Sequence, residues 1–276
     1  MKGLYSFIIV LLVNALITVR ADYVFAPLPI VNEKQTILKA KPFATALSNL
    51  LGSPVSVRYY PSYDEILTAF TKGDIDFAEL GPFNLLKLKK MTTHFAPLVF
   101  VPRIKNQTSY RCHLVAAMDN SFKFHELAQL KSPKIALTQP LSTCGWFSMD
   151  YFFQKNGLDL RQYNYQFIGS HDGVALSVLR LEHDFGAVAE FISRRYQPLG
   201  LEIIASTPEL PLFTLVANSS RISNKVQQKV QHYLLNLSEQ ETAQWGFGRY
   251  GFLPCRSELF KQFEKMVAKM RPIPEK

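Results

Sequence analysis

The sequence predicts an α/β fold with two lobes, and three observations support this prediction. Short apolar, β-branched runs alternate with amphipathic helical patterns along most of the 276 residues, as in sheets covered by helices. The alternation breaks at Asn106-Gln107-Thr108 and then starts again. A Pro-rich stretch at 207–212 precedes a last apolar run and the final helices. If these helices pack on the first lobe, the chain crosses between the lobes twice, near 106–112 and near 207–212.

The first lobe is predicted to contain residues 22–110 plus 212–276, from β-branched runs and helix-end signals. Gly52 ends the first helical pattern, and Ser62 with Glu65 forms a capping box at the start of the second. Pro82 follows Gly81 at the first position of a third helix. In order, we expect strands at 24–28, 55–59, 75–80, 95–101 and 213–217, and helices at 34–51, 63–70, from 82 onwards, and at 222–236, 239–245 and 256–269.

The second lobe is predicted to contain residues 111–211. Its helices begin after strand-like runs, and Asn156-Gly157 is a typical helix end. The regular alternation indicates sheets with parallel strands. We expect strands at 110–117, 133–138, 163–168, 185–189 and 201–205, and helices at 124–130, 145–155, 172–181 and 190–196.

Residues 1–21 have the organisation of a secretory signal peptide. Lys2 supplies a basic start, an apolar run follows from Leu4 to Val19, and Val19 and Ala21 stand at the −3 and −1 positions of a cut before Asp22. An uncleaved membrane anchor is the alternative, although the run is short for a membrane span. We therefore expect a periplasmic protein that is cleaved after about Ala21.

Charge and cysteine content limit the possible ligands. Without the first 21 residues, the chain has 29 basic and 22 acidic side chains and a formal net charge of +7. This excess of positive charge suits an anionic ligand. The one dense cluster of basic residues consists of Lys87, Lys89 and Lys90 and has no interleaved aromatic residues. It therefore indicates a solvated helix face rather than a nucleic-acid interface. The three cysteines have no zinc-binding spacing and the histidines are dispersed, so we expect neither a metal nor another cofactor.

Four predicted helix starts follow strands and should therefore meet at strand C-terminal edges: Ser62, Gly81-Pro82, the stretch 142–145, and Ser170. A helix N-terminus has unpaired N–H groups and a partial positive charge, which together favour an anion. In the stretch 142–145, Ser142 and Thr143 add hydroxyl donors, and Gly145 would let the backbone approach a ligand closely. Ordinary capping explains any single one of these sites, but the stretch 142–145 is richer than one cap requires.

An ordered set of motifs resembles one family of proteins. These motifs are Y-D-E-I-L-T-A-F, G-D-I-D-F-A-E-L-G-P, S-Y-R-C, L-S-T-C-G, G-S-H-D-G-V-A-L-S-V-L, G-A-V-A-E and W-G-F-G-R-Y-G-F-L-P, between residues 63 and 254. Their order is similar to that in phosphonate-binding proteins, the periplasmic solute-binding components of ABC importers for phosphonates, phosphite and related oxyanions. The resemblance implies a type II periplasmic-binding-protein fold with two hinge crossings and a ligand in the cleft between the lobes. It also implies an ABC permease as partner, and we expect a monomer.

The resemblance implies a set of ligand residues. Tyr63 and Tyr110 match the tyrosines that wall the cleft in this family, Ser142 and Thr143 match a pair of hydroxyl donors, and His171 matches a further donor. We expect three further residues to contact the ligand: the neighbouring Cys144 and Gly145, and Glu190. Cys144 stands where the family usually has serine, so a weak S–H donor replaces a strong one.

Binders of aminoalkylphosphonates place two acids around the ligand's ammonium group. Glu190 could be one of them, but 211–216 contain no second acid. We therefore expect a compact anion such as phosphite, phosphate or a short alkylphosphonate.

Several alternatives stay open at this point. Cys112 and Cys144 could form a disulfide, remain as buried thiols, or bind arsenite, because Cys112 shares a strand face with Tyr110. A ligand-sensing role with a membrane sensor kinase fits the same fold. Cys144 with His171, or Ser142 with His171 and Asp172, has the residue types of a hydrolase, but there is no G-x-S-x-G motif, and we expect no catalysis.

Overall fold

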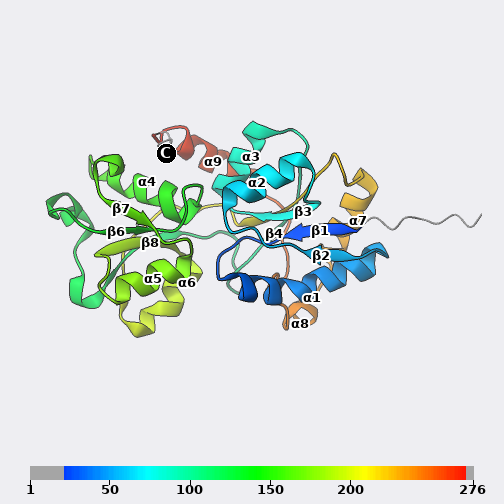
Figure 1. Cartoon of the computed structure of the whole chain (residues 1–276), viewed down its shortest axis with the longest axis horizontal. Helices are drawn as coiled ribbons and strands as arrows, with labels where there is room; N and C mark the ends of the chain where they lie inside the picture. Colours follow the sequence, from blue (N-terminus) through cyan, green and yellow to red (C-terminus); the bar gives the residue numbers. More distant parts are fainter. Residues whose placement is uncertain (1–21, 272–276) are drawn as a thin grey trace, which may run out of the picture.

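Two five-stranded sheets form the centres of two lobes in the computed structural model, which describes residues 22–271 (Figure 1). The predicted signal peptide, residues 1–21, lies outside the described residues. No helix within 22–271 has the length and apolar character that a membrane span requires.

The first sheet has the strand order β2-β1-β3-β10-β4. β1 runs parallel to β2 and β3, whereas β10 is antiparallel to both β3 and β4. The elements of this lobe are β1 (Tyr23–Ala26), α1 (Glu33–Leu51), β2 (Val55–Val57), α2 (Tyr63–Lys72), β3 (Phe77–Leu80), α3 (Pro82–Met91), β4 (Ala96–Val101), β10 (Phe213–Ala217), α7 (Asn224–Leu235), α8 (Glu239–Thr242) and α9 (Ser257–Val267).

The second sheet has the strand order β7-β6-β8-β5-β9. β6 runs parallel to β7 and β8, and β5 is antiparallel to β8 and β9. Its elements are β5 (Cys112–Ala117), the 3-10 turns η1 (Met118–Asn120) and η2 (Phe124–Gln129), β6 (Ile135–Leu137), the π-helical turn η3 (Thr143–Phe147), α4 (Ser148–Lys155), η4 (Leu160–Gln162), β7 (Tyr165–Phe167), α5 (His171–Leu179), β8 (Phe185–Ala189), α6 (Glu190–Tyr196), η5 (Gln197–Leu199) and β9 (Leu201–Ser206).

The chain crosses between the lobes from β4 to β5 and from β9 to β10. The two crossings pair with each other, because Tyr110 and Leu210 exchange backbone hydrogen bonds of 3.1 and 2.8 Å. β5 and β10 arrive directly from the opposite lobe without a crossover helix, and they enter their sheets antiparallel to their neighbours. The sheets are therefore mixed, not parallel throughout as the sequence pattern predicted.

Each sheet is covered by helices on both faces. In the first lobe, Phe25 packs with the α1 and α7 side of the core, while the adjacent Val24 and Ala26 pack with α2 and α3. In the second lobe, α4 covers one face and α5 and α6 cover the other. Successive strand residues point to opposite faces, so strands covered on both sides consist almost entirely of apolar residues.

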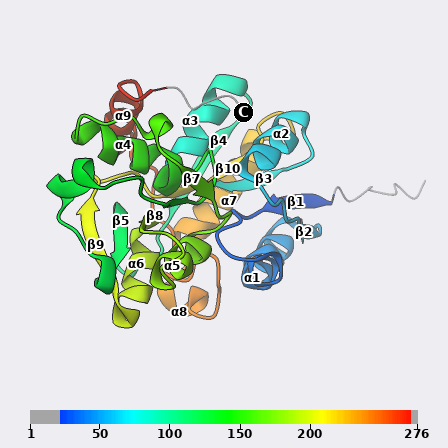
Figure 2. The same cartoon turned by 60° about the vertical axis from the view of Figure 1, so that its left-hand side comes forward.

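The C-terminal helix α9 contacts both lobes. Its Phe263 ring lies 4.9 Å from the ring of Phe147 in the second lobe, and Glu264 forms a 2.7 Å ion pair with Lys89 of α3. Just beyond the helix, Arg271 donates a 3.0 Å hydrogen bond to the carbonyl of Leu158. Figure 1 and Figure 2 both place α9 beside α4. The lobes are therefore held together by this helix as well as by the two crossings.

Candidate ligand-binding site

A small cavity lies between the lobes, where the N-termini of α2, α3, η3 and α5 meet. Its volume is about 10 Å³, which is barely room for one water molecule. The lobes are closed on each other here, because hydrogen bonds join them around the cavity. The cavity is lined by Leu28, Tyr63, Gly81, Asn84, Tyr110, Ser142, Thr143, Cys144, His171 and Phe213.

The structure brings six of the eight expected ligand residues to this cavity and leaves two outside its lining. The six are Tyr63, Tyr110, Ser142, Thr143, Cys144 and His171. Glu190 instead accepts a 2.5 Å hydrogen bond from Arg194 and one of 3.3 Å from the backbone N–H of Arg111. Gly145 packs within its own lobe, where an added Cβ would lie 2.2 Å from the Thr138 hydroxyl. Its missing side chain therefore makes room for protein atoms rather than for a ligand.

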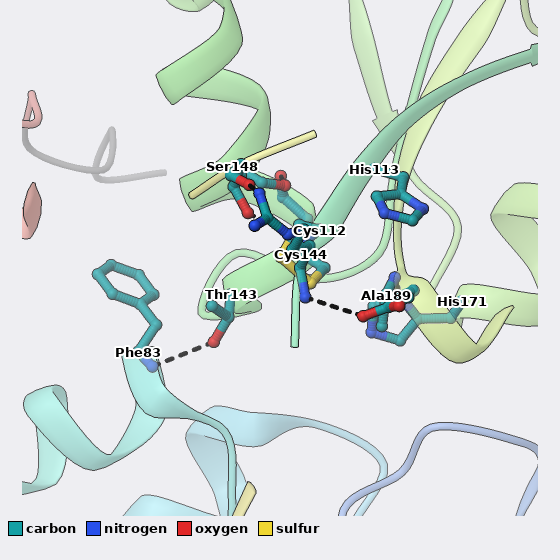
Figure 3. Close-up of a disulfide and its surroundings, with 12 residues drawn as sticks. Phe83, Cys112, His113, Thr143, Cys144, Ser148, His171 and Ala189 are labelled. Carbon is teal, nitrogen blue, oxygen red and sulfur yellow. Dashed lines mark hydrogen bonds between the residues drawn. A yellow bond between two sulfur atoms is a disulfide. The ribbon is translucent and has the colours of Figure 1, made fainter. Parts of the chain in front are cut away.

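The Ser142 and Thr143 hydroxyls differ in function from ordinary helix caps. Ser62 and Ser170 accept hydrogen bonds from the third residue of their own helices, at 3.2 and 3.1 Å. Ser142 makes no such cap bond, and its hydroxyl instead lies close enough to the Tyr63 hydroxyl of the other lobe to affect the pKa of that tyrosine. The Thr143 hydroxyl accepts a 3.1 Å hydrogen bond from the Phe83 backbone N–H, near the N-terminus of α3 (Figure 3). Both hydroxyls therefore lie where the two lobes meet.

Two buried tyrosines supply hydroxyl donors. Burial raises the pKa of both Tyr63 and Tyr110, so each remains protonated at neutral pH. The Tyr110 ring stacks on Phe213 with 5.1 Å between ring centroids. Its hydroxyl lies near Thr143, yet within residues 22–271 it makes no well-oriented hydrogen bond. An unpaired buried hydroxyl costs about 1–3 kcal/mol, so a ligand oxygen that accepts from Tyr110 would be stabilised.

His171 is a neutral donor. It is 3% exposed, and burial lowers its pKa to about 4. The Ala189 backbone N–H donates to Nδ1 over 3.3 Å, which places the imidazole proton on Nε2. Figure 3 shows the His171 ring beside Ala189. His171 can therefore donate to an anion without being charged beforehand.

The cavity is lined by neutral groups only. None of the ten described residues around it carries a charge at neutral pH, because His171 is neutral. Hydroxyl, imidazole and backbone N–H donors at helix N-termini therefore provide the positive potential. A carboxylate that could pair with a ligand ammonium is absent from this lining.

Three contacts in this region were not expected from the sequence. Asn84 accepts from the N–H of Gly81 (3.3 Å) and donates to the Leu141 carbonyl of the other lobe (2.9 Å). Gln139 accepts from the N–H of Tyr63 at 3.0 Å, also across the cleft. The position of Asn84, three residues after Gly81 in a predicted helix start, is a weak signal for such a contact, and Gln139 has no comparable signal.

Comparison with known proteins identifies the family. Residues 25–258 match the sequence model of the family described as ABC transporter, phosphonate, periplasmic substrate-binding protein. The chain belongs to this family. The proteins of this family are periplasmic substrate-binding components of transporters rather than enzymes.

Solved structures show the same fold at low sequence identity. PhnD1 from Prochlorococcus marinus in complex with methylphosphonate aligns with a TM-score of 0.78 at 19% identity, over 90% of this chain and 97% of that chain. A binding protein component of an ABC phosphonate transporter from Pseudomonas aeruginosa has a TM-score of 0.78 at 18% identity, over 90% and 86%. A Xanthomonas citri protein bound to ATP has a TM-score of 0.73 at 17% identity, over 92% and 99%. These likenesses establish the type II fold.

A disulfide joins Cys112 and Cys144 and corrects the expectation of a thiol donor. The two residues lie 32 positions apart in the sequence, with a Cα–Cα distance of 5.0 Å. Cys144 therefore has no S–H group to donate, and two thiols are not available for arsenite. Cys112 begins β5 directly after the first crossing, so the bond fixes the Ser142–Thr143 segment to the start of the second sheet (Figure 3).

The low pKa of His171 predicts a pH-dependent loss of stability. The unfolded chain binds the proton near pH 6.5, whereas the folded chain resists it down to about 4, so stability present above pH 6.5 is lost as the pH falls. We expect His171→Gln to reduce the loss of unfolding free energy between about pH 7 and about pH 4.5 by about 2–3 kcal/mol. Urea unfolding at both pH values measures this, with His232→Gln as an exposed histidine control. An equal loss in His171→Gln and the unmodified protein would contradict the assignment.

The disulfide predicts a redox dependence of both stability and binding. We expect reduction to lower the unfolding free energy by about 2–4 kcal/mol, because the unfolded chain is no longer constrained. It should also weaken the binding of a phosphonate, because the Ser142–Thr143 segment is released. Thermal unfolding and calorimetry with and without reductant test this. The variant Cys112→Ala/Cys144→Ala should no longer respond to reductant, while Cys255→Ser should respond fully; identical behaviour of the oxidised and reduced protein would show that the bond constrains nothing.

Proposed function

We propose that this phosphonate-binding protein captures a compact phosphorus oxyanion and delivers it to an ABC permease. Phosphite, phosphate and short alkylphosphonates such as methylphosphonate are the expected ligands. The observation that carries the proposal is the small interlobe cavity. Its lining, among the described residues, consists of neutral donors and apolar groups and includes no charged residue. The proposed lobes, residues 22–110 plus 212–276 and 111–211, supply donors from both sides of this cavity.

The donor types match the needs of a tetrahedral anion. Tyr63, Tyr110, Ser142 and Thr143 offer hydroxyl protons, and His171 offers its Nε2 proton. The N-terminus of α5 adds the partial positive charge of its first backbone N–H groups. Hydrogen bonds to an ionised oxygen are roughly twice as strong as neutral ones, and they need no charged partner. Such a set can surround a tetrahedral anion with three or four oxygens once the lobes move apart enough to enlarge the cavity beyond about 10 Å³.

The absence of an acid from the cavity lining favours a ligand without an ammonium group. Glu190 is occupied by Arg194 and Arg111, and Glu79, the nearest acid on β3, is buried in an ion pair with Arg103. An aminoalkylphosphonate would bring an ammonium group into a site that offers it no carboxylate. The Prochlorococcus marinus protein, which has this fold, was solved with methylphosphonate, a ligand of the size and charge proposed here.

Contacts across the cleft couple ligand binding to closure. Thr143 with Phe83, Asn84 with Leu141, and Tyr63 with Gln139 already join the lobes through hydrogen bonds of 2.9–3.1 Å. A ligand that accepts from Tyr63 on one lobe and from His171 on the other stabilises only the closed arrangement. It therefore shifts the hinge equilibrium toward the form that a permease can distinguish from the open one.

The proposal predicts selective binding that depends on Thr143. We expect phosphite or methylphosphonate to bind, and Thr143→Val to weaken the binding about 10–100-fold, because a hydrogen bond to a charged group contributes about 1.5–3 kcal/mol. Titration calorimetry with phosphite, phosphate, methylphosphonate, sulfate and 2-aminoethylphosphonate measures both effects. Ser223→Ala removes a capping hydroxyl outside the cavity and is the matched control. Much tighter binding of 2-aminoethylphosphonate than of phosphite, or unchanged affinity in Thr143→Val, would overturn the proposal.

A further inference from the structure

A second, larger cavity lies between the lobes on the side of α1, α6 and the segment after α8. Its volume is about 250 Å³. Leu28 lines both cavities, so the second one lies next to the small one. Phe191 and Arg195 of α6 contribute from the second lobe.

Four cationic side chains line this second cavity: Lys39, Arg103, Arg195 and Arg249. Two of them have acidic partners, because Arg103 pairs with Glu79 and Arg195 forms a 3.0 Å ion pair with Asp172. Within residues 22–271, Lys39 and Arg249 form no salt bridge. The cavity is therefore lined by two cations, Lys39 and Arg249, without an ion pair in residues 22–271, and by one acid, Glu79, which pairs with Arg103.

The cations approach one another from both lobes. Burial is the main cause that lowers the pKa of Lys39; the Arg195 guanidinium on α6 lowers it further, whereas Asp172, the ion-pair partner of Arg195, raises it. Like charges from the two lobes oppose closure, and Asp172 offsets part of this repulsion. An anion with more than one charge can contact Arg195 of one lobe and Lys39 or Arg249 of the other at the same time.

Packing holds the walls of this cavity in place. The Phe247 backbone N–H donates a 3.0 Å hydrogen bond to the Lys39 carbonyl, which joins the segment 245–250 to α1. The Arg103 guanidinium lies over the rings of Phe213 and Phe247, with its Cζ 5.3 and 5.8 Å from their centroids. Trp245 and Tyr250 add partly buried aromatic walls. The cavity therefore has a defined shape with positive charge along its sides.

We propose that this cavity is a second binding site, for a small polyanion of the diphosphate type, held by Lys39 and Arg249 of the first lobe and Arg195 of the second. It is distinct from the neutral cavity at Thr143. The inner cavity selects a compact oxyanion through neutral donors, whereas the outer one recognises charge through lysine and arginine. Because its cations come from both lobes, a bound polyanion favours the closed protein.

Calorimetry with inorganic pyrophosphate as the probe tests this site. We expect pyrophosphate to bind, with an affinity that falls as salt is added, and Arg195→Gln or Lys39→Gln/Arg249→Gln to weaken it about tenfold or more. Arg194→Gln is the matched control, because it removes the adjacent charge of α6, which lies outside the cavity lining. Thr143→Val should leave pyrophosphate binding unchanged while it weakens phosphite binding. Thermal unfolding of each variant confirms that it is folded.

The possible outcomes separate this proposal from the proposed function. Loss of pyrophosphate binding in Thr143→Val, with no effect of Arg195→Gln, would place the probe in the inner cavity and overturn the second site. If Arg194→Gln weakened pyrophosphate binding as much as Arg195→Gln, the binding would reflect general charge attraction, and the second site would also be overturned. Binding of phosphite without any binding of pyrophosphate would overturn the second site alone. Binding of pyrophosphate that depends on Arg195, without binding of phosphite or methylphosphonate, would support the second site and overturn the proposed function.

Discussion

The hydrogen bond from the Phe83 backbone N–H to the Thr143 hydroxyl connects two helix N-termini that belong to different lobes. Its length is 3.1 Å, and it closes a cavity whose walls are neutral donors. Bringing two helix N-termini together opposes two partial positive charges, and hydroxyl oxygens between them offset part of that cost. The geometry of the cavity depends on this contact, because Tyr63, Asn84 and Ser142 converge only when the lobes meet.

The disulfide and the crossings set the position of the Thr143 segment within its own lobe. Cys112 starts the strand that leaves the first crossing, and Cys144 follows Thr143 directly. Gly145, with no room for a Cβ beside Thr138, allows the turn to pack closely beneath the site. A donor segment that is covalently fixed to the hinge strand loses less conformational entropy when a ligand binds.

The two cavities provide positive potential for an anion in different ways. In the buried inner cavity, a lysine or arginine would have to be desolvated before any ligand arrived, so neutral donors and helix N-termini are less costly. In the outer cavity, Lys39, Arg195 and Arg249 are each exposed to solvent, although Lys39 is desolvated enough for its pKa to fall. There, charge can attract anions toward the cleft at little cost to the folded state.

The sequence by itself determined the order of strands and helices, the two crossings and most of the polar residues at the cavity. These features depend on neighbours within a few positions: the periodicity of apolar residues, Ser62 and Ser170 as caps, and Gly52 as a helix end in the left-handed region, with φ 67°. Family resemblance pointed to His171 and Thr143 through short local motifs.

Tertiary structure alone decided the remaining features, because they join residues that are distant in the sequence. Phe83 and Thr143 are 60 positions apart and Tyr63 and Gln139 are 76 apart, so no local pattern contains either pair. The same holds for the pairing of Cys112 with Cys144 and for the antiparallel entry of β5 and β10 into their sheets. Glu190 was expected to contact the ligand, but it forms an ion pair with Arg194, which lies one helical turn later. How the two lobes close therefore decides which polar groups meet across the cavity and which, like Glu190, are left outside its lining.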